Sequence, residues 1–169
     1  MFEYFKQLLS PLPRFSEIKN LIENKKYIEV LEILDSFEQD SKVNKKTLTD
    51  YKKLCVEGFI TDIYEKATKC FTNKQYNEAS RLSKIGMKAI IDNCEYLDMD
   101  RKLLVNFCEQ LGEDMKDKTS IPISGFKDFR DKHRKRATEL FVDVRIGSNL
   151  EMLVDLILMP AICNSFSKD

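Results

Sequence analysis

Residues 70–80 read Cys-Phe-Thr-Asn-Lys-Gln-Tyr-Asn-Glu-Ala-Ser, and this stretch decides how the chain is predicted to fold. The polar pair Asn73-Lys74 follows a helical pattern and marks a tight turn. Tyr76 then begins a second helical pattern, with the small residue Ala79 three positions later. Because a tyrosine can pack across such a turn and a small residue lets two helices approach, the stretch predicts the corner of a helical hairpin.

The same pattern occurs earlier in the chain, at residues 21–31, which read Leu-Ile-Glu-Asn-Lys-Lys-Tyr-Ile-Glu-Val-Leu. With an offset of 49 residues, Asn24-Lys25 superposes on the later turn, Tyr27 on the later tyrosine, and Val30 takes the place of the small residue. The sequence therefore predicts two helical corners of one kind.

These two corners resemble the tetratricopeptide (TPR) hairpin, in which a turn of Asn or Gly with Lys or Asp precedes Tyr-x-x-Ala. The resemblance covers about residues 16–91, and Tyr76 with Ala79 matches best. The chain departs from the family in its spacing, because the family repeats about every 34 residues, and in Ser83, where an aromatic residue is usual. The resemblance implies stacked helix pairs that grip peptides or partner proteins without catalysis.

Apolar residues recur at three and four positions along almost the whole chain, which is the helical period. We predict an all-α fold of stacked antiparallel helical hairpins, either TPR-like or an irregular helical bundle. It contains about seven helices, over 2–9, 16–23, 27–39, 47–72, 75–91, 99–116 and 126–144, followed by an apolar helix over 150–159 that Pro160 ends. Ser16 and Thr47 are predicted N-caps. Gly86 is predicted to permit a close helix crossing. Apolar and polar residues alternate at 141–146, which is also compatible with a short strand.

The clearest loop, residues 119–125, separates segments of opposite charge. Residues 92–118 hold eight acids and four bases, whereas 126–145 hold seven bases and four acids. We predict a helical-hairpin domain over 1–118, a loop over 119–125, and a C-terminal part over 126–169 that packs on the same core.

The composition and the cysteine pattern make several classes of protein less favoured. The net charge is zero, which disfavours a surface that is basic throughout and built for nucleic acid. The five cysteines form no CxxC pair and are expected to be buried and reduced, with no metal and no cofactor; they are Cys55, Cys70, Cys94, Cys108 and Cys163. With no secretory signal and no membrane-length apolar run, we expect a cytoplasmic protein without membrane contact.

His133 is the only histidine, and it lies at helical spacing between Phe129 and Ala137. No nucleophile-elbow or phosphate-loop pattern occurs. We therefore interpret His133 as a packing residue and expect neither an enzyme nor a small-molecule substrate.

The preferred functional hypothesis is a non-catalytic adaptor, inhibitor or regulatory subunit that docks on a larger protein partner or assembly. Its expected contact elements are the aromatic helix over 2–9, the groove beside Tyr27 and Tyr76, and the apolar helix over 150–159, represented by Leu153 and Ile157.

A second hypothesis uses the basic helix at 127–136. There the chain would be a ribonucleoprotein- or ribosome-associated factor that binds RNA phosphates. The residues expected to do so are Lys127, Arg130, Lys132, Arg134, Lys135 and Arg136. A third hypothesis, based on the composition typical of AT-rich genomes, is a viral helical-bundle regulator of a host protein.

Overall fold

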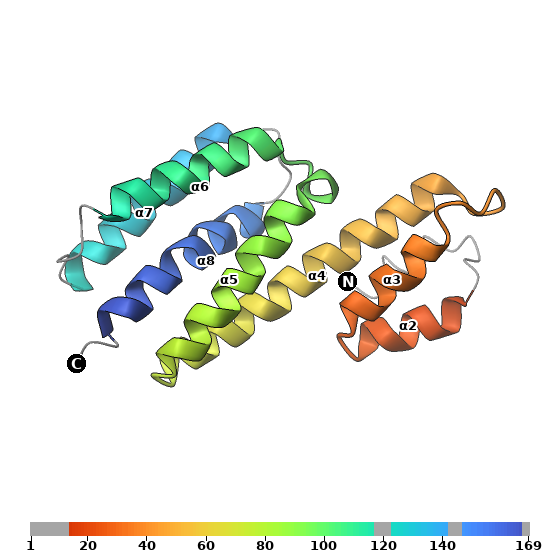
Figure 1. The fold of residues 1–169 in the computed structure, drawn as a ribbon, viewed down its shortest axis with the longest axis horizontal. Coiled ribbons are helices and arrows are strands. Elements are labelled where there is room, and N and C mark those ends of the chain that lie inside the picture. Colours follow the sequence, from red (N-terminus) through yellow and green to blue (C-terminus); the bar gives the residue numbers. More distant parts are fainter. Residues whose placement is uncertain (1–13, 117–122, 142–146, 167–169) are drawn as a thin grey trace. The chain divides into compact units, whose positions relative to one another are not determined.

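The computed structural model describes residues 14–116, 123–141 and 147–166 of the chain (Figure 1). Its elements are α2 (Phe15–Glu23), α3 (Tyr27–Ser36), α4 (Lys45–Thr72), α5 (Tyr76–Asp92), the 3-10 helix η1 (Cys94–Leu97), α6 (Arg101–Lys116), α7 (Ile123–Leu140) and α8 (Gly147–Phe166). None of the described residues forms a strand, and the predicted all-α fold is confirmed. The helix expected over 2–9 and most of the alternative strand, 142–146, lie outside the described residues.

The chain divides into two compact units, Met1–Phe59 and Ile60–Asp169, and the division falls inside α4. We call them the N-terminal unit and the C-terminal unit and describe each by itself. Residues 123–125, expected in a loop, belong to the first turn of α7. Residues 117–122 lie outside the described part, and a domain boundary at 119–125 stays a prediction.

The two residues predicted as N-caps, Ser16 and Thr47, are not the caps of their helices. α4 begins at Lys45, because the side-chain oxygen of Asn44 accepts hydrogen bonds from the backbone N–H groups of Lys46 and Thr47, at 2.9 and 3.2 Å. Thr47 is thus a residue of the first turn and not the cap. α2 begins at Phe15, before the predicted cap Ser16. It follows Arg14, whose carbonyl accepts the N–H groups of Glu17 and Ile18.

The two predicted corners have the same backbone geometry. At the first, Lys25 has φ 57°, its N–H donates to Ile22, and the N–H of Lys26 donates to Leu21. At the second, Lys74 has φ 60°, its N–H donates to Phe71, and the N–H of Gln75 donates to Cys70. This pair of bonds is the Schellman ending of a helix, with lysine at the left-handed position where glycine is usual.

The N-terminal unit has its own apolar core, in which Ile18 of α2, Val30 and Leu34 of α3, and Tyr51 and Cys55 of α4 are buried together. Beside it, the side chain of Lys52 is 3% exposed, and its Nζ lies 2.5 Å from Asp35 Oδ1 and also contacts Glu38. The hydrogen bond from Lys52 lowers the pKa of the Glu38 carboxyl. The two carboxylates compensate the burial of the lysine charge.

In the C-terminal unit, α8 packs against α5, α6 and α7. The buried side chains of α8 occur on all sides of the helix; they are Met152, Leu153, Val154, Leu156, Leu158, Met159 and Cys163. α8 continues through Pro160 to Phe166, so the predicted helix end at Pro160 is wrong. Buried side chains on both sides of the proline, Met159 and Cys163, hold the helix in the core and offset the local loss of a backbone hydrogen bond.

Gly86 of α5 permits the close helix crossing that the sequence predicts. A Cβ atom at this position would lie 2.9 Å from Leu156 Cδ1 of α8 and 3.0 Å from Ile63 Cγ2 of α4. Three helices of the C-terminal unit therefore meet at a backbone without a side chain. The contact holds α5 against α8 by apolar packing.

Candidate functional site

The two corner tyrosines contact residues of their own units. In the N-terminal unit, the ring of Tyr27 lies over Gly58, where a Cβ would come within 2.6 Å of its Cε1 atom. In the C-terminal unit, Tyr76 stacks on Phe166 of α8 with ring centroids 5.3 Å apart, and its ring meets Phe71 edge-on at 5.7 Å. Tyr76 thus packs across its turn as predicted, and both rings are half-buried.

The apolar residues expected to contact a partner lie on α8. Leu153 is 1% exposed and belongs to the core of the C-terminal unit, and Ile157 is half-buried. A helix that is apolar on nearly all sides is either a core element or a helix that binds in a partner's groove. The burial of its side chains identifies it as a core element of its unit.

Arg134 of α7 points into the C-terminal unit. Its Nη2 donates to Asp155 Oδ2 of α8 at 2.6 Å, and the hydroxyl of Tyr64 in α4 donates to the same oxygen at 2.9 Å. Glu151 of α8 lies 3.4 Å from Arg134 Nη1. We call these four side chains the Asp155 network.

The charges of the Asp155 network depend on each other. Burial alone would lower the pKa of Arg134, but the hydrogen bond and negative charge of Asp155 outweigh it, and the pKa is raised. Burial and the charge of Asp155 also raise the pKa of Tyr64. The guanidinium of Arg134 is therefore paired with Asp155 inside the C-terminal unit.

A second polar contact joins α7 to α6. Arg136 donates to Gln110 and lies 4.0 Å from Asp114, whose Oδ2 is 3.6 Å from Nε2 of the fully buried His133. The ring of Phe129 lies 4.3 Å from that of His133. His133 is thus placed as the packing residue that its spacing predicts, and the acidic helix α6 contacts the basic helix α7.

The remaining basic residues of α7 differ in exposure. Arg130 is half-buried with Asp131 3.7 Å away, whereas Lys127, Lys132 and Lys135 are exposed. Lys135 lies 4.0 Å from Glu139. The exposed acids Asp128 and Asp131 lie among these lysines along α7, so its outer surface carries both signs of charge.

All five cysteines are free thiols. Three of them are buried as expected, whereas Cys70 and Cys108 are only half-buried. Burial raises the pKa of Cys55 to about 12, and burial together with Glu109 raises that of Cys108 to about 11. Both are therefore thiols and not thiolates near neutral pH. Within residues 14–116, 123–141 and 147–166, no group of His, Cys, Asp and Glu is suited to hold a metal ion. No helix in these ranges has the length and apolar character needed to cross a bilayer.

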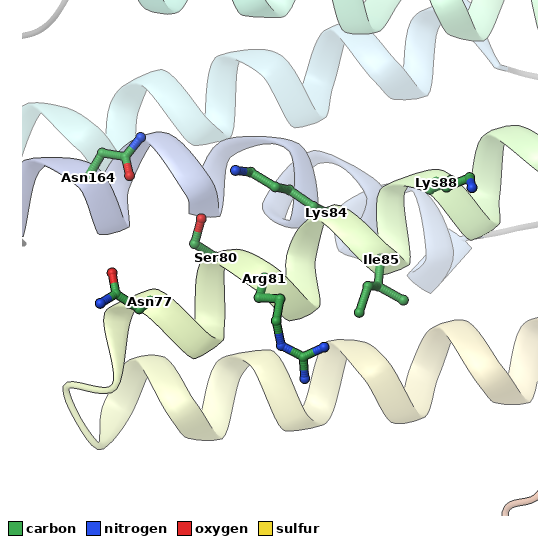
Figure 2. A pocket seen from close by; sticks show the side chains of 7 residues that line it. All are labelled: Asn77, Ser80, Arg81, Lys84, Ile85, Lys88 and Asn164. Carbon is green, nitrogen blue, oxygen red and sulfur yellow. The ribbon is translucent and has the colours of Figure 1, made fainter.

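An open pocket of about 510 Å³ lies on the outer face of α5, where α8 borders it (Figure 2). We call it the α5 pocket. Its lining residues are Asn77, Ser80, Arg81, Lys84, Ile85, Lys88 and Asn164. All but Asn164 come from successive turns of α5. Asn164 lies on α8, and Figure 2 shows it at the same end of the pocket as Asn77 of α5.

The lining of the α5 pocket is basic, with three cations and no carboxylate. Glu78, one residue outside the lining, accepts hydrogen bonds from Arg81 at 2.8 and 2.6 Å, which raise the pKa of Arg81. Lys84 and Lys88 are exposed and form no ion pair with any residue that the structure describes. Ile85 lies among these cations with 36% of its surface exposed.

Sequence reasoning did not single out this pocket. An apolar residue within the helical pattern of residues 75–91 is expected to face inward, and Ile85 is exposed instead. The signal was the spacing of Arg81, Lys84 and Lys88, which places three cations on one side of a helix. This spacing is less conspicuous in the sequence than the denser run of bases in α7.

No known protein family, curated protein or solved structure was found to match this chain.

Proposed function

We propose that the protein is a non-catalytic docking module that binds a protein partner through the α5 pocket. The observation that carries this proposal is the exposed side of α5, where Lys84 and Lys88 flank Ile85. Cations around an accessible apolar side chain suit a protein partner, because the apolar contact contributes affinity and the charges direct the approach. The resemblance to TPR hairpins agrees with such a role.

The α5 pocket is a stronger candidate than the basic helix α7, which the RNA hypothesis uses. Arg134 and Arg136 contact acidic or amide groups of their own unit. On α7 the exposed lysines alternate with exposed acids, whereas no acid lines the α5 pocket. RNA binding by α7 therefore stays the second hypothesis, and its outcome is distinguishable in the experiment below.

The test is site-specific photo-crosslinking in cells that express the full chain. One variant carries a photo-crosslinking amino acid at position 85, and the matched control carries it at position 140. The two native residues are similarly exposed, Ile85 at 36% and Leu140 at 38%, and both belong to the C-terminal unit.

We expect position 85 to yield a discrete crosslinked protein that position 140 does not yield. The double charge reversal K84E/K88E should abolish that product. Equal products from both positions, no product from position 85, or a product that survives the charge reversal would each contradict the proposal. Crosslinks to RNA from position 140 alone would favour the second hypothesis.

A further inference from the structure

We infer that the α5 pocket binds an acidic segment of the partner protein, in which an apolar side chain lies between carboxylates. This inference rests on the proposed function and specifies the chemistry of the partner. Three observations carry it: the charge of the lining, the spacing of its cations, and the uncharged groups among them.

The charge of the lining is unbalanced. Arg81 is held by Glu78 through two hydrogen bonds, so its charge is largely compensated within α5. Lys84 and Lys88 have no such carboxylate among the described residues. An occupant with negative charge is attracted here, whereas a basic occupant is repelled.

The spacing of the two lysines limits the arrangement of the partner's charges. Residues 84 and 88 are four apart on α5, and side chains so placed are neighbours with Cβ atoms about 6 Å apart. Two carboxylates on adjacent turns of a helix, or two residues apart in an extended segment, have a similar separation. The occupant therefore needs at least two nearby carboxylates.

The uncharged groups favour a peptide over a nucleic acid. Ile85 offers an apolar contact beside the lysines, and the lining has no aromatic ring on which a base would stack. At the other end of the pocket, the amides of Asn77 and Asn164 and the hydroxyl of Ser80 supply donors and acceptors. Such groups suit the backbone N–H and C=O groups of a peptide.

The experiment measures fluorescence anisotropy of three labelled probes with the full chain at low salt. The first probe is a 12-residue peptide with glutamates on both sides of two leucines. The second is the same peptide with every glutamate replaced by glutamine, and the third is a single-stranded RNA of 20 nucleotides. The protein variants are K84E/K88E, Ile85→Ala and, as a matched charge reversal on α7, K127E/K132E.

We expect the acidic peptide to bind at least tenfold more tightly than its glutamine analogue. K84E/K88E should weaken that binding by about tenfold or more. Ile85→Ala should weaken it by about threefold, and K127E/K132E should leave it within about twofold. Circular dichroism verifies that each variant keeps its helical content.

Three results would overturn the inference: equal binding of the acidic and glutamine peptides, equal loss with the α5 and α7 charge reversals, or tighter RNA binding that K84E/K88E abolishes. If none of the peptides binds while the crosslink from position 85 persists, the acidic chemistry is wrong and the proposed docking role stands. If the acidic peptide binds while the crosslink is absent, the docking role fails.

Discussion

α5 and α7 both pack against α8, but they differ in how many of their charged side chains form contacts within the unit. α5 approaches α8 at Gly86 through apolar contacts with Leu156. α7 buries Phe129 and Ala137, and it is also joined to α8 through the Asp155 network and to α6 through Arg136 and His133. Arg134 and Arg136 of α7 form contacts within the unit, and exposed acids lie among the exposed lysines of this helix. The denser run of positive charge in the sequence therefore presents a surface of mixed sign. The apolar attachment of α5 leaves Lys84 and Lys88 exposed.

The largest effect is expected from breaking the polar attachment of α7. Asp155→Ala leaves the partly buried Arg134 without its main partner, and we expect it to lower the free energy of unfolding by about 3 kcal/mol. Urea denaturation followed by circular dichroism measures this value. The control is Glu151→Ala: the Glu151 side chain is 60% exposed, and its loss should cost only about 0.5 kcal/mol. Equal effects of the two variants would show that Asp155 does not hold α7.

The apolar attachment of α5 is tested by adding one methyl group. In Gly86→Ala, the new Cβ meets Leu156 and Ile63, and we expect a loss of about 1 kcal/mol from overpacking. Gly112→Ala in α6 is the matched control, because a Cβ there meets no atom within 4 Å. It should stabilise the unit by up to about 1 kcal/mol through better helix propensity. Stabilisation by both variants would contradict the close crossing.

Much of this architecture could be predicted from the sequence. The helical period predicted the fold class. The repeated Asn-Lys-x-Tyr pattern predicted two corners, and both have the same pattern of backbone hydrogen bonds. Gly86, a glycine in the middle of a helical pattern, predicted the close helix crossing. These features depend on neighbours along the chain or on one helix face, so local pattern determines them.

Which charged side chains remain exposed could not be predicted in the same way. Arg134 meets Asp155 only after α7 and α8 have packed, and no local pattern tells which of the many acids an arginine will contact. Pro160 likewise ends a helix by local rules but lies inside α8, because the core on both sides holds it. Whether a charged side chain stays exposed depends on how the helices pack. The difference in exposed charge between α5 and α7 therefore cannot be deduced from local sequence.

A smaller effect concerns the corner at which α5 begins. Lys74 has φ 60°, a conformation that costs a residue with a side chain about 1 kcal/mol relative to glycine. Lys74→Gly should therefore raise the free energy of unfolding by about 0.5–1 kcal/mol. Lys74→Ala is the control and should leave stability nearly unchanged, since alanine has the same penalty. Thermal denaturation of both variants compares them, and destabilisation by glycine alone would refute the Schellman geometry.

The central claim is that α5, and not the more basic α7, presents the binding surface. Its most direct test is two-dimensional NMR of the ¹⁵N-labelled full chain titrated with the acidic 12-residue peptide. If the peptide binds at α5, chemical-shift changes will concentrate on residues 77–88 of α5 and on Asn164, and residues 127–139 of α7 will be unaffected. Changes concentrated on α7, or spread evenly over both helices, would contradict the central claim.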